Sequence, residues 1–285
     1  MVSDNTKFVY LNGELIPEDL AMISIFDSGF LSGDAIFEGV RVKNGKFFQL
    51  DEHIEMLWES AKALDMDLDF LKQDVKEAIF ESAKKNGFSD DGYLRVQISR
   101  GRMTKPFMNP TLARGECSLV IYPDDSKENY GGTGARIITS VIMRLPPSGL
   151  DQKIHSCNKI NSLLAKTQAN LVGMDEALML DMNGFIAECS AMNIFFVKDG
   201  RLLTPYAKSC KLGVTRQYLL DNVGKLGIEA FERDLSLYDA YNSDECFMCG
   251  THSGLTSVTE IDGRKIGNGK IGETTRKIMK WYSSR

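Results

Sequence analysis

The sequence lacks a long apolar run and an excess of positive charge. No stretch has the length that a signal segment or a bilayer-spanning helix needs, so we expect a cytoplasmic protein. Lysine and arginine total 34 against 39 aspartates and glutamates, a net charge of -5. Nucleic acid and anionic membranes select for basic surfaces, so neither is expected as the main partner. A small-molecule ligand is the better expectation.

The six cysteines show no pairing pattern, and without a secretory signal we expect reduced thiols. Cys246 and Cys249 have Cys-x-x-Cys spacing, but they lie in an apolar run that predicts a buried strand. Residues three apart on a strand point to opposite faces, and no second pair completes a zinc site. Buried cysteines are therefore favoured over a metal site.

A length of 285 residues with 43% hydrophobic residues predicts two globular domains. The pattern predicts a small N-terminal α+β domain over 1–123, a polar, glycine-rich linker over 124–134 and a larger α/β domain over 135–285. Local signals are a hairpin around Asn12-Gly13, helices near 54–64 and 71–85, and strands at 93–98 and 117–122. After residue 135 the pattern alternates between strands, at 135–142, 176–181, 184–197 and 244–249, and helices, after Ser156 and over 215–226. A ligand site is expected in a cleft between the two domains.

Residues 153–166 read KIHSCNKINSLLAK. This segment resembles the Lys-Ser-x-Asn-Tyr-Leu-x-x-x-Leu-Ala segment of the class IV (fold type IV) pyridoxal-phosphate aminotransferases, the branched-chain and D-amino-acid group. In that family the lysine that opens the segment forms the Schiff base with the cofactor. His155 stands at that position here.

Further motifs match the same family in the same order. They are FDSGFLSGDAIFEGVR at 26–41, DEAL at 175–178, NGFIAE at 183–188, NIF at 193–195, LTP at 203–205, LGVTR at 212–216 and GT at 250–251. The resemblance implies the two-domain α/β fold of this family, a homodimer, pyridoxal phosphate as cofactor and an amino or keto acid as substrate.

Two sets of residues match the cofactor site of the family. Glu188 resembles the carboxylate that keeps the pyridine nitrogen protonated, the state in which the ring withdraws electrons. A phosphate needs backbone N–H donors at a glycine-permitted helix start. The matching residues are Gly213, Val214, Thr215, Gly250 and Thr251. The alternatives are a solvated glutamate at a strand end and an ordinary helix start.

Three residues depart from the family pattern. His155 replaces the Schiff-base lysine, Met56 stands where an arginine usually binds the phosphate, and Lys159 replaces a tyrosine that binds the ring oxygen. A methionine cannot make a charge-assisted bond to phosphate, so cofactor binding is expected to be weaker. Met56 also argues against an engineered lysine replacement, which would not require a second change.

Two residues are candidates to take over the chemistry of the missing Schiff-base lysine. Lys159 could form the covalent bond with the cofactor, with an exposed lysine in the first helical turn as an equally supported alternative. Lys153 is a weaker candidate, expected on the same strand face as His155 and roughly 6.6 Å away. His155 could itself act as a base on a noncovalently held cofactor, or be a tolerated residue in an inactive site.

On the substrate side, Phe37, Tyr93 and Arg95 resemble residues of the branched-chain group. His252 matches a loop that binds the substrate carboxylate in the family. The leading hypothesis is an aminotransferase-like enzyme with an altered site, in which a lyase, dehydratase or racemase reaction is also open. The alternative is an inactive homologue that uses the fold as a ligand-binding or interaction scaffold.

Overall fold

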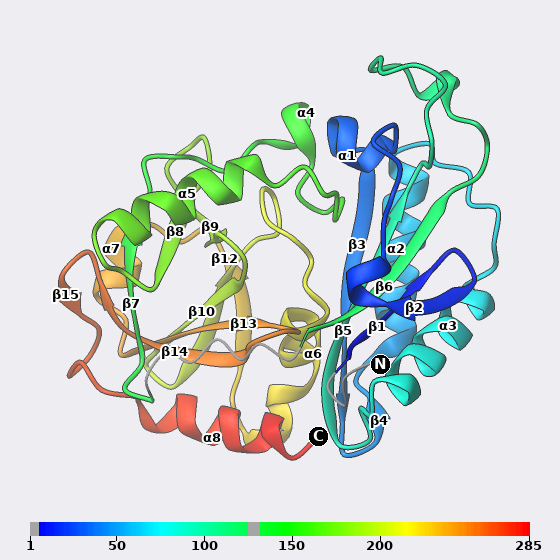
Figure 1. Cartoon of the computed structure of the whole chain (residues 1–285). Coiled ribbons are helices and arrows are strands. Elements are labelled where there is room, and N and C mark those ends of the chain that lie inside the picture. The colour runs from blue at the N-terminus through cyan, green and yellow to red at the C-terminus, as the bar shows by residue number, and fades with distance from the viewer. Residues whose placement is uncertain (1–5, 125–131) are drawn as a thin grey trace. The chain divides into compact units, whose positions relative to one another are not determined.

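The computed structural model describes residues 6–124 and 132–285, and the chain divides into two compact units (Figure 1). Unit 1 comprises Met1–Ser126 and Ile154–Asn158, and unit 2 comprises Lys127–Lys153 and Lys159–Arg285. Most of the predicted linker, residues 125–131, lies outside the described residues. The domain boundaries drawn from the sequence stay a prediction.

Residues 6–124 form a six-stranded sheet in which every neighbouring pair is antiparallel, with the order β2-β1-β6-β5-β3-β4. Its strands are β1 (Phe8–Leu11), β2 (Glu14–Pro17), β3 (Ala35–Lys43), β4 (Lys46–Phe47), β5 (Asp91–Ser99) and β6 (Ser118–Asp124). Asn12 and Gly13 both adopt positive φ, 50° and 100°, the geometry of a tight hairpin turn. The predicted hairpin is confirmed.

The two long helices of unit 1 cover one face of this sheet. The helices of the unit are α1 (Ser28–Ser32), α2 (Leu50–Ala63) and α3 (Lys72–Lys85), with short 3₁₀ turns at Glu18–Leu20 and Pro110–Leu112. Both predicted helices are confirmed as α2 and α3. In α3, the Asp74 carboxylate accepts the Leu71 N–H at 2.7 Å and so satisfies a donor at the helix start.

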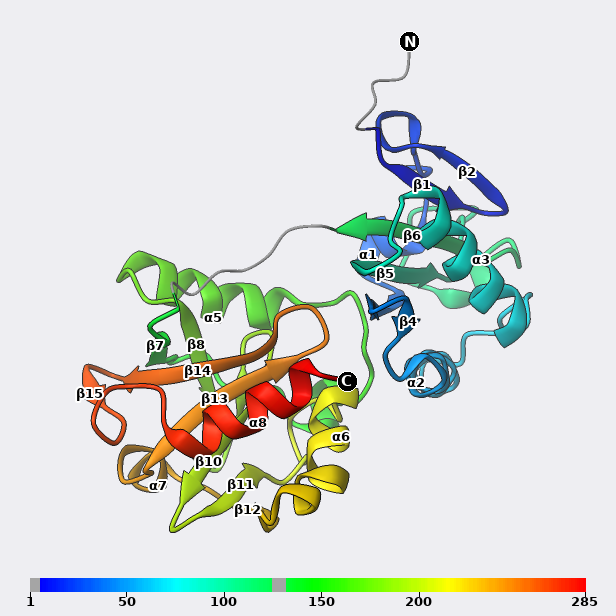
Figure 2. The ribbon, with the colours of Figure 1, turned by 90° about the horizontal axis from the view of Figure 1, so that it is seen from below.

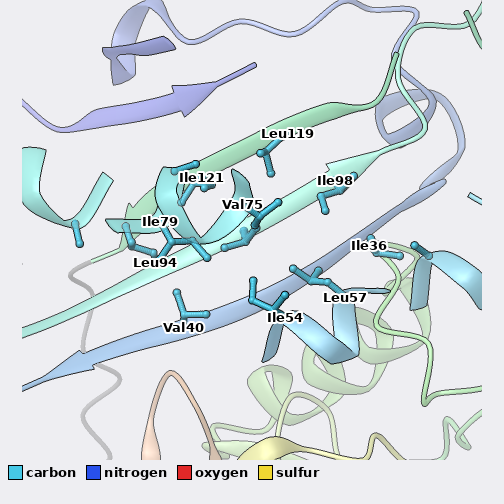
Figure 3. Close-up of a cluster of buried hydrophobic side chains, with 14 of the residues drawn as sticks. Ile36, Val40, Ile54, Leu57, Val75, Ile79, Leu94, Ile98, Leu119 and Ile121 are labelled. Carbon is cyan, nitrogen blue, oxygen red and sulfur yellow. The ribbon is translucent and has the colours of Figure 1, made fainter. Parts of the chain in front are cut away.

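Alternate positions of β5 point into the core of unit 1, where Leu94 and Ile98 meet side chains from the two long helices (Figure 3). Ile54 of α2 and Ile79 of α3 are among the buried helical residues. Core side chains thus recur at every second residue of the strand and at every third or fourth residue of the helices, and the two sets pack together. Each such side chain contributes about 1.5–3 kcal/mol when fully buried.

The segment Ile154–Asn158 is fixed to the start of β3. The Phe37 N–H donates to the His155 carbonyl at 2.9 Å, and the Cys157 N–H donates to the Ala35 carbonyl at 2.7 Å. Ile36 and Ser156 form an antiparallel bridge between these two bonds. His155 is therefore held beside Phe37 by backbone hydrogen bonds.

Residues 132–285 form a nine-stranded sheet of order β12-β11-β10-β13-β14-β7-β8-β9, with β15 paired to β14. Its strands are β7 (Ala135–Thr139), β8 (Glu176–Leu180), β9 (Ile186–Cys189), β10 (Asn193–Lys198), β11 (Arg201–Pro205), β12 (Ala230–Arg233), β13 (Glu245–Gly250), β14 (Gly254–Ile261) and β15 (Arg264–Lys265). The strands expected at 135–142, 176–181 and 244–249 are present as β7, β8 and β13, and the expected helices are present as α5 (Ile160–Leu171) and α6 (Val214–Asn222). The segment expected as one strand at 184–197 is divided into β9 and β10. The connections from β8 to β9 and from β10 to β11 are too short for a helix, and each of these two pairs is antiparallel.

Unit 2 has a core on each side of this sheet. One cluster collects inward side chains from β7 to β14, including Leu178, Ile194 and Val258, so the sheet curves around it. On the outer face α6 and α8 pack on β10 and β13, and α5 packs on β8 (Figure 2). The helices are α4 (Pro147–Leu150), α5 (Ile160–Leu171), α6 (Val214–Asn222), α7 (Leu237–Tyr241) and α8 (Glu273–Ser283), with a 3₁₀ turn at Val223–Leu226.

The two cysteines of the Cys-x-x-Cys pair lie on β13 and belong to different cores. Cys246 packs in the inner cluster and Cys249 in the outer one. Both thiols are buried and free, and burial raises the pKa of Cys249 to about 12. Their opposite orientation confirms the prediction from strand geometry.

Truncation of Ile79 to alanine is expected to destabilise unit 1 by about 2–5 kcal/mol, because the side chain is fully buried. The matched control is Ile25→Ala, whose side chain is 69% exposed and whose effect is expected within about 0.5 kcal/mol. Urea unfolding is followed by Trp58 fluorescence in a Trp281→Phe background, so that the signal comes from unit 1. Equal midpoints for the two variants would contradict the assigned core.

Candidate functional site

Three of the predicted residues stack in unit 1. The Phe37 ring lies 3.8 Å from the His155 ring, measured between centroids, and the Arg95 guanidinium carbon lies 3.5 Å from the Phe37 centroid. Strands β3 and β5 place Phe37 and Arg95, and the segment Ile154–Asn158 places His155. The Arg95 Nε is buried and has no hydrogen-bond partner within the described part of the chain. The structure thus brings these three residues into direct contact.

Tyr93 lies on the same strand as Arg95 and packs over Gly39 of β3. A Cβ atom at position 39 would overlap the Tyr93 hydroxyl, so glycine is required there for the ring to lie flat on the sheet. Burial raises the pKa of Tyr93 above its ordinary value, and the nearby Arg95 charge opposes this only in part. Tyr93 is therefore a neutral hydroxyl at physiological pH.

The His155 imidazole is bound to a buried carboxylate that the sequence had not singled out. His155 Nδ1 lies 2.7 Å from Glu38 Oε1, and His53 Nδ1 lies 2.8 Å from Glu38 Oε2. Glu38 belongs to the matched motif at 26–41. His53 belongs to the segment EHIEML at 52–57, which resembles the family's Glu-His-x-x-Arg-Leu pattern with Met56 at the arginine position. The position of Glu38 and His53 inside these two motifs is the sequence signal that could have identified them. Met56 itself is half-buried on α2.

Glu188 is buried on β9 and bound by three groups of unit 2. The Arg144 guanidinium lies 3.0 Å from Oε1, measured from Nε, while Asn193 Nδ2 and the Lys211 N–H donate to Oε2 at 3.1 and 3.3 Å. The Arg144 contact is an ion pair by distance, although its Nε–H is not directed at the oxygen. Glu188 is only 5% exposed, so the alternative of a solvated glutamate is wrong.

Arg144 was missed in the sequence because it lies in an irregular segment that matches no motif. Its terminal nitrogens donate to the Ser162 hydroxyl at 2.7 Å and to the Cys189 and Ser190 carbonyls at 2.7 and 2.9 Å. These bonds fix the guanidinium in place beside Glu188. The arrangement presents a permanent positive charge to a buried carboxylate.

Burial raises the pKa of Glu188 above its ordinary range, and the charges of Arg144 and then Lys159 oppose that shift. Lys159 is the half-buried residue that precedes α5, close enough for its charge to act on Glu188. Lys153 lies in a turn and pairs with Asp151 at 3.3 Å, so its expected place on a strand is wrong. Of the two lysines, Lys159 is the one whose charge acts on Glu188.

The first predicted phosphate loop lies beside Glu188. A Cβ atom at Gly213 would overlap Asn193 Oδ1, and Asn193 Nδ2 donates to the Lys211 carbonyl at 3.0 Å as well as to Glu188. Val214 and Thr215 open α6 directly after Gly213. Thr215 is 2% exposed, and its hydroxyl has no hydrogen-bond partner among residues 6–124 and 132–285.

The second predicted phosphate loop also lies near the start of β10 in unit 2. Gly250 ends β13 one residue after Cys249, which pairs with Asn193 across the sheet. A Cβ atom at Gly250 would lie 3.4 Å from Met192 Cγ. Thr251 and His252 follow and are half-buried. The two loops and Glu188 therefore meet at the start of β10.

Comparison with known proteins identifies the family. A family model described as "Amino-transferase class IV" matches residues 35–261, and the chain belongs to the class IV aminotransferase family. The chain is 38% identical over 283 residues to "Branched-chain-amino-acid aminotransferase-like protein 2" of Arabidopsis thaliana, a match that covers 99% of the chain and 51% of that protein. It is 39% identical over 275 residues to a "Putative branched-chain-amino-acid aminotransferase" of Methanocaldococcus jannaschii, covering 96% and 94% respectively. The chain thus spans about half the length of the Arabidopsis relative.

The fold matches solved structures of the same family. A branched-chain amino acid aminotransferase solved in complex with N-(5'-phosphopyridoxyl)-L-glutamate superposes with a TM-score of 0.91 at 31% identity, and the match covers 97% of this chain and 93% of that chain. The branched-chain aminotransferase of Thermoproteus uzoniensis, solved with norvaline, superposes with a TM-score of 0.88 at 30% identity, with the same coverage of 97% and 93%. The family and fold expected from the sequence are confirmed.

Two further expectations concern absences. Within the described ranges, no cluster of three or more histidine, cysteine, aspartate or glutamate side chains has the arrangement of a metal site. In the same ranges, none of the helices combines the length and the apolar character needed to span a bilayer.

The raised pKa of Glu188 predicts a pH-dependent stability. The folded state binds the proton more tightly than the unfolded state, so the contribution is present below the ordinary pKa of about 4.5 and is lost as pH rises through the raised value. Relative to Glu188→Gln, the wild type should therefore lose stability from about pH 4.5 upward.

The measurement is urea unfolding over this pH range, followed by Trp281 fluorescence in a Trp58→Phe background. Glu229→Gln, at a side chain that is 70% exposed, is the matched control. A wild type that instead gains relative stability with rising pH would show that the Arg144 pair and the hydrogen bonds outweigh burial.

Proposed function

We propose that this chain is a class IV aminotransferase-type enzyme that binds pyridoxal phosphate in unit 2 and acts on an amino or keto acid. The observation that carries the proposal is the meeting of Glu188 with both glycine loops at the start of β10. Pyridoxal phosphate supplies an electron sink for charge that develops at the substrate's α-carbon. Transamination is the default reaction, since the family relatives bear aminotransferase names.

Glu188 has the properties that a partner of the pyridine nitrogen needs. An N–H⁺ of a pyridine ring requires an anionic acceptor that is shielded from water. Arg144 and Lys159 place positive charge near the carboxylate and oppose the effect of burial. A positively charged pyridine ring would also oppose the effect of burial. Binding of the ring would therefore favour ionisation of Glu188, and ionisation of Glu188 would favour binding.

Thr215 has the properties that a phosphate ligand needs. Its hydroxyl is buried without a partner among the described residues, and a buried polar group in that state costs about 1–3 kcal/mol. It lies in the first turn of α6, where backbone N–H groups and the helix dipole favour an anion. Gly213, Val214, Gly250 and Thr251 would supply further donors.

His155 stands where the family has its Schiff-base lysine, so two roles need other assignments: covalent attachment of the cofactor and proton transfer. Lys159, whose charge acts on Glu188, is proposed as the residue that attaches the cofactor covalently. His155, which is hydrogen-bonded to Glu38, is proposed as the base if attachment is noncovalent. Lyase, dehydratase and racemase reactions follow from the second arrangement as readily as transamination does.

The remaining parts of the proposal rest on the family resemblance. Phe37, Tyr93, Arg95 and His252 are the proposed substrate-binding residues. A homodimer is proposed on the same basis. A cytoplasmic location, with neither nucleic acid nor membrane as partner, is proposed from the lack of a long apolar run and from the net charge of -5.

A second candidate function is a ligand-binding or interaction scaffold without chemistry. The observation that favours it is the engagement of His155 by Glu38 together with the presence of Met56 in place of a phosphate-binding arginine. On this account unit 2 would not bind pyridoxal phosphate saturably.

Replacing Thr215 with valine is expected to weaken pyridoxal phosphate binding roughly 10- to 150-fold, the effect of losing a hydrogen bond worth about 1.5–3 kcal/mol to a charged group. The matched control is Thr275→Val, which removes from the start of α8 another buried hydroxyl that has no hydrogen-bond partner among the described residues. Affinity is measured by absorbance titration. Equal losses in the two variants would refute the phosphate role of Thr215.

Borohydride reduction of the protein with pyridoxal phosphate is expected to label the peptide that contains Lys159. Lys159→Ala should abolish the label, and Lys153→Ala should retain it, because Lys153 lies in an exposed turn. Peptide mapping by mass spectrometry identifies the site. Saturable binding without a labelled lysine would favour His155 as base, and no saturable binding would favour the scaffold.

A further inference from the structure

Glu38 is a buried carboxylate with one imidazole at each oxygen. Oε1 lies 2.7 Å from His155 Nδ1, Oε2 lies 2.8 Å from His53 Nδ1, and the Glu38 side chain is 2% exposed. The three residues come from β3, from α2 and from the segment Ile154–Asn158, which all belong to unit 1. The carboxylate therefore joins segments that are 15 and 117 positions away in the sequence.

The chemistry of this contact fixes the position of protons. An ionised carboxylate only accepts hydrogen bonds, so each Nδ1 atom that binds it must carry a hydrogen. A neutral imidazole carries one ring hydrogen, which leaves the Nε2 atom with a lone pair. A neutral His53 or His155 that donates to an ionised Glu38 must therefore be in the Nδ1–H form.

The two imidazoles differ in access to solvent. The His53 side chain is 1% exposed, whereas that of His155 is 16% exposed. The His155 backbone is also fixed, since its N–H donates to the Ser60 hydroxyl at 3.1 Å and its carbonyl accepts the Phe37 N–H at 2.9 Å. His155 is therefore the partly solvent-accessible imidazole bound to Glu38, and His53 is the buried one.

Two further ionisable groups near this network lie on β5. Tyr93 stays neutral because burial raises its pKa, and the Arg95 guanidinium lies over Phe37, whose ring separates it from the His155 face. Neither group is an anion that could take the hydrogen of an imidazole in place of Glu38. The carboxylate of Glu38 is the acceptor that determines the tautomer.

We infer that Glu38 is a positioning residue that holds His155 in the Nδ1–H form, so that Nε2 accepts a proton, and that His53 locks the Glu38 carboxylate from its other oxygen. The use of this base on an amino or keto acid rests on the proposed function. The tautomer itself does not depend on it.

The test is long-range ¹⁵N–¹H NMR of the protein at about pH 8, where an ordinary imidazole is neutral. The sequence contains three histidines, so His53→Asn and His155→Asn suffice to assign every ring. We expect Nδ1–H for both His53 and His155 in the wild type. An Nε2–H form of His155 in the wild type would overturn the inference without any further variant.

Glu38→Gln provides the second readout. A neutral amide offers one acceptor oxygen and one donor nitrogen, so the two imidazoles can no longer both donate to residue 38. At least one of them should change to the Nε2–H form, and Glu38→Asp should retain both wild-type tautomers. Glu81→Gln, at an exposed glutamate of α3, is the control and should change neither.

Unchanged tautomers in a folded Glu38→Gln variant would also overturn the inference. The spectra are recorded without pyridoxal phosphate, so this outcome is separate from failure of the proposed function. Loss of cofactor binding with intact tautomers would refute only the latter.

Discussion

The Glu188 carboxylate lies out of water, and the groups that balance its charge tie together segments of unit 2 that are distant in sequence. Arg144 follows β7, Asn193 opens β10 and Lys211 precedes α6. Arg144 and Asn193 each have a second contact, so neither can move without breaking another bond. Because an uncompensated buried charge costs several kcal/mol, the positions of these segments depend on Glu188. The predicted phosphate loop after Lys211 is aligned by the same contacts.

Unit 1 contains a second buried carboxylate whose charge is balanced in another way. A guanidinium is always charged, so Arg144 opposes protonation of Glu188. Imidazoles near neutral pH are N–H donors that can also exchange protons, so the partners of Glu38 favour proton transfer instead. On this account, unit 2 provides the electrostatic requirements of a pyridine ring and a phosphate. In unit 1 the His155 imidazole is held by Glu38 and by backbone hydrogen bonds.

Local patterns in the sequence predicted the main elements of both units but not every break between them. The Asn12-Gly13 turn and the alternation of β5 are short-range signals, and both are confirmed. Residues 184–197 were predicted as one strand segment, but the Cys189 N–H bonds the Met192 carbonyl and a tight turn separates β9 from β10. Both strands are buried on a curved sheet, so no polar alternation marks the break.

The candidate site was predictable only where it coincides with family motifs. Glu188 and the glycine loops were found in this way. Arg144 lies in no motif, and no local pattern can show that His53 and His155 meet on one carboxylate from positions 102 residues apart (155 − 53). Long-range contacts of this kind depend on the tertiary fold.

The most direct measurement of the central claim is a titration of the purified wild type and Glu188→Gln with pyridoxal phosphate at one pH. The account predicts saturable binding by the wild type and binding at least about tenfold weaker in the variant, because a charged hydrogen bond to the ring nitrogen is lost. Equal affinity in both proteins, or no saturable binding by the wild type, would contradict it.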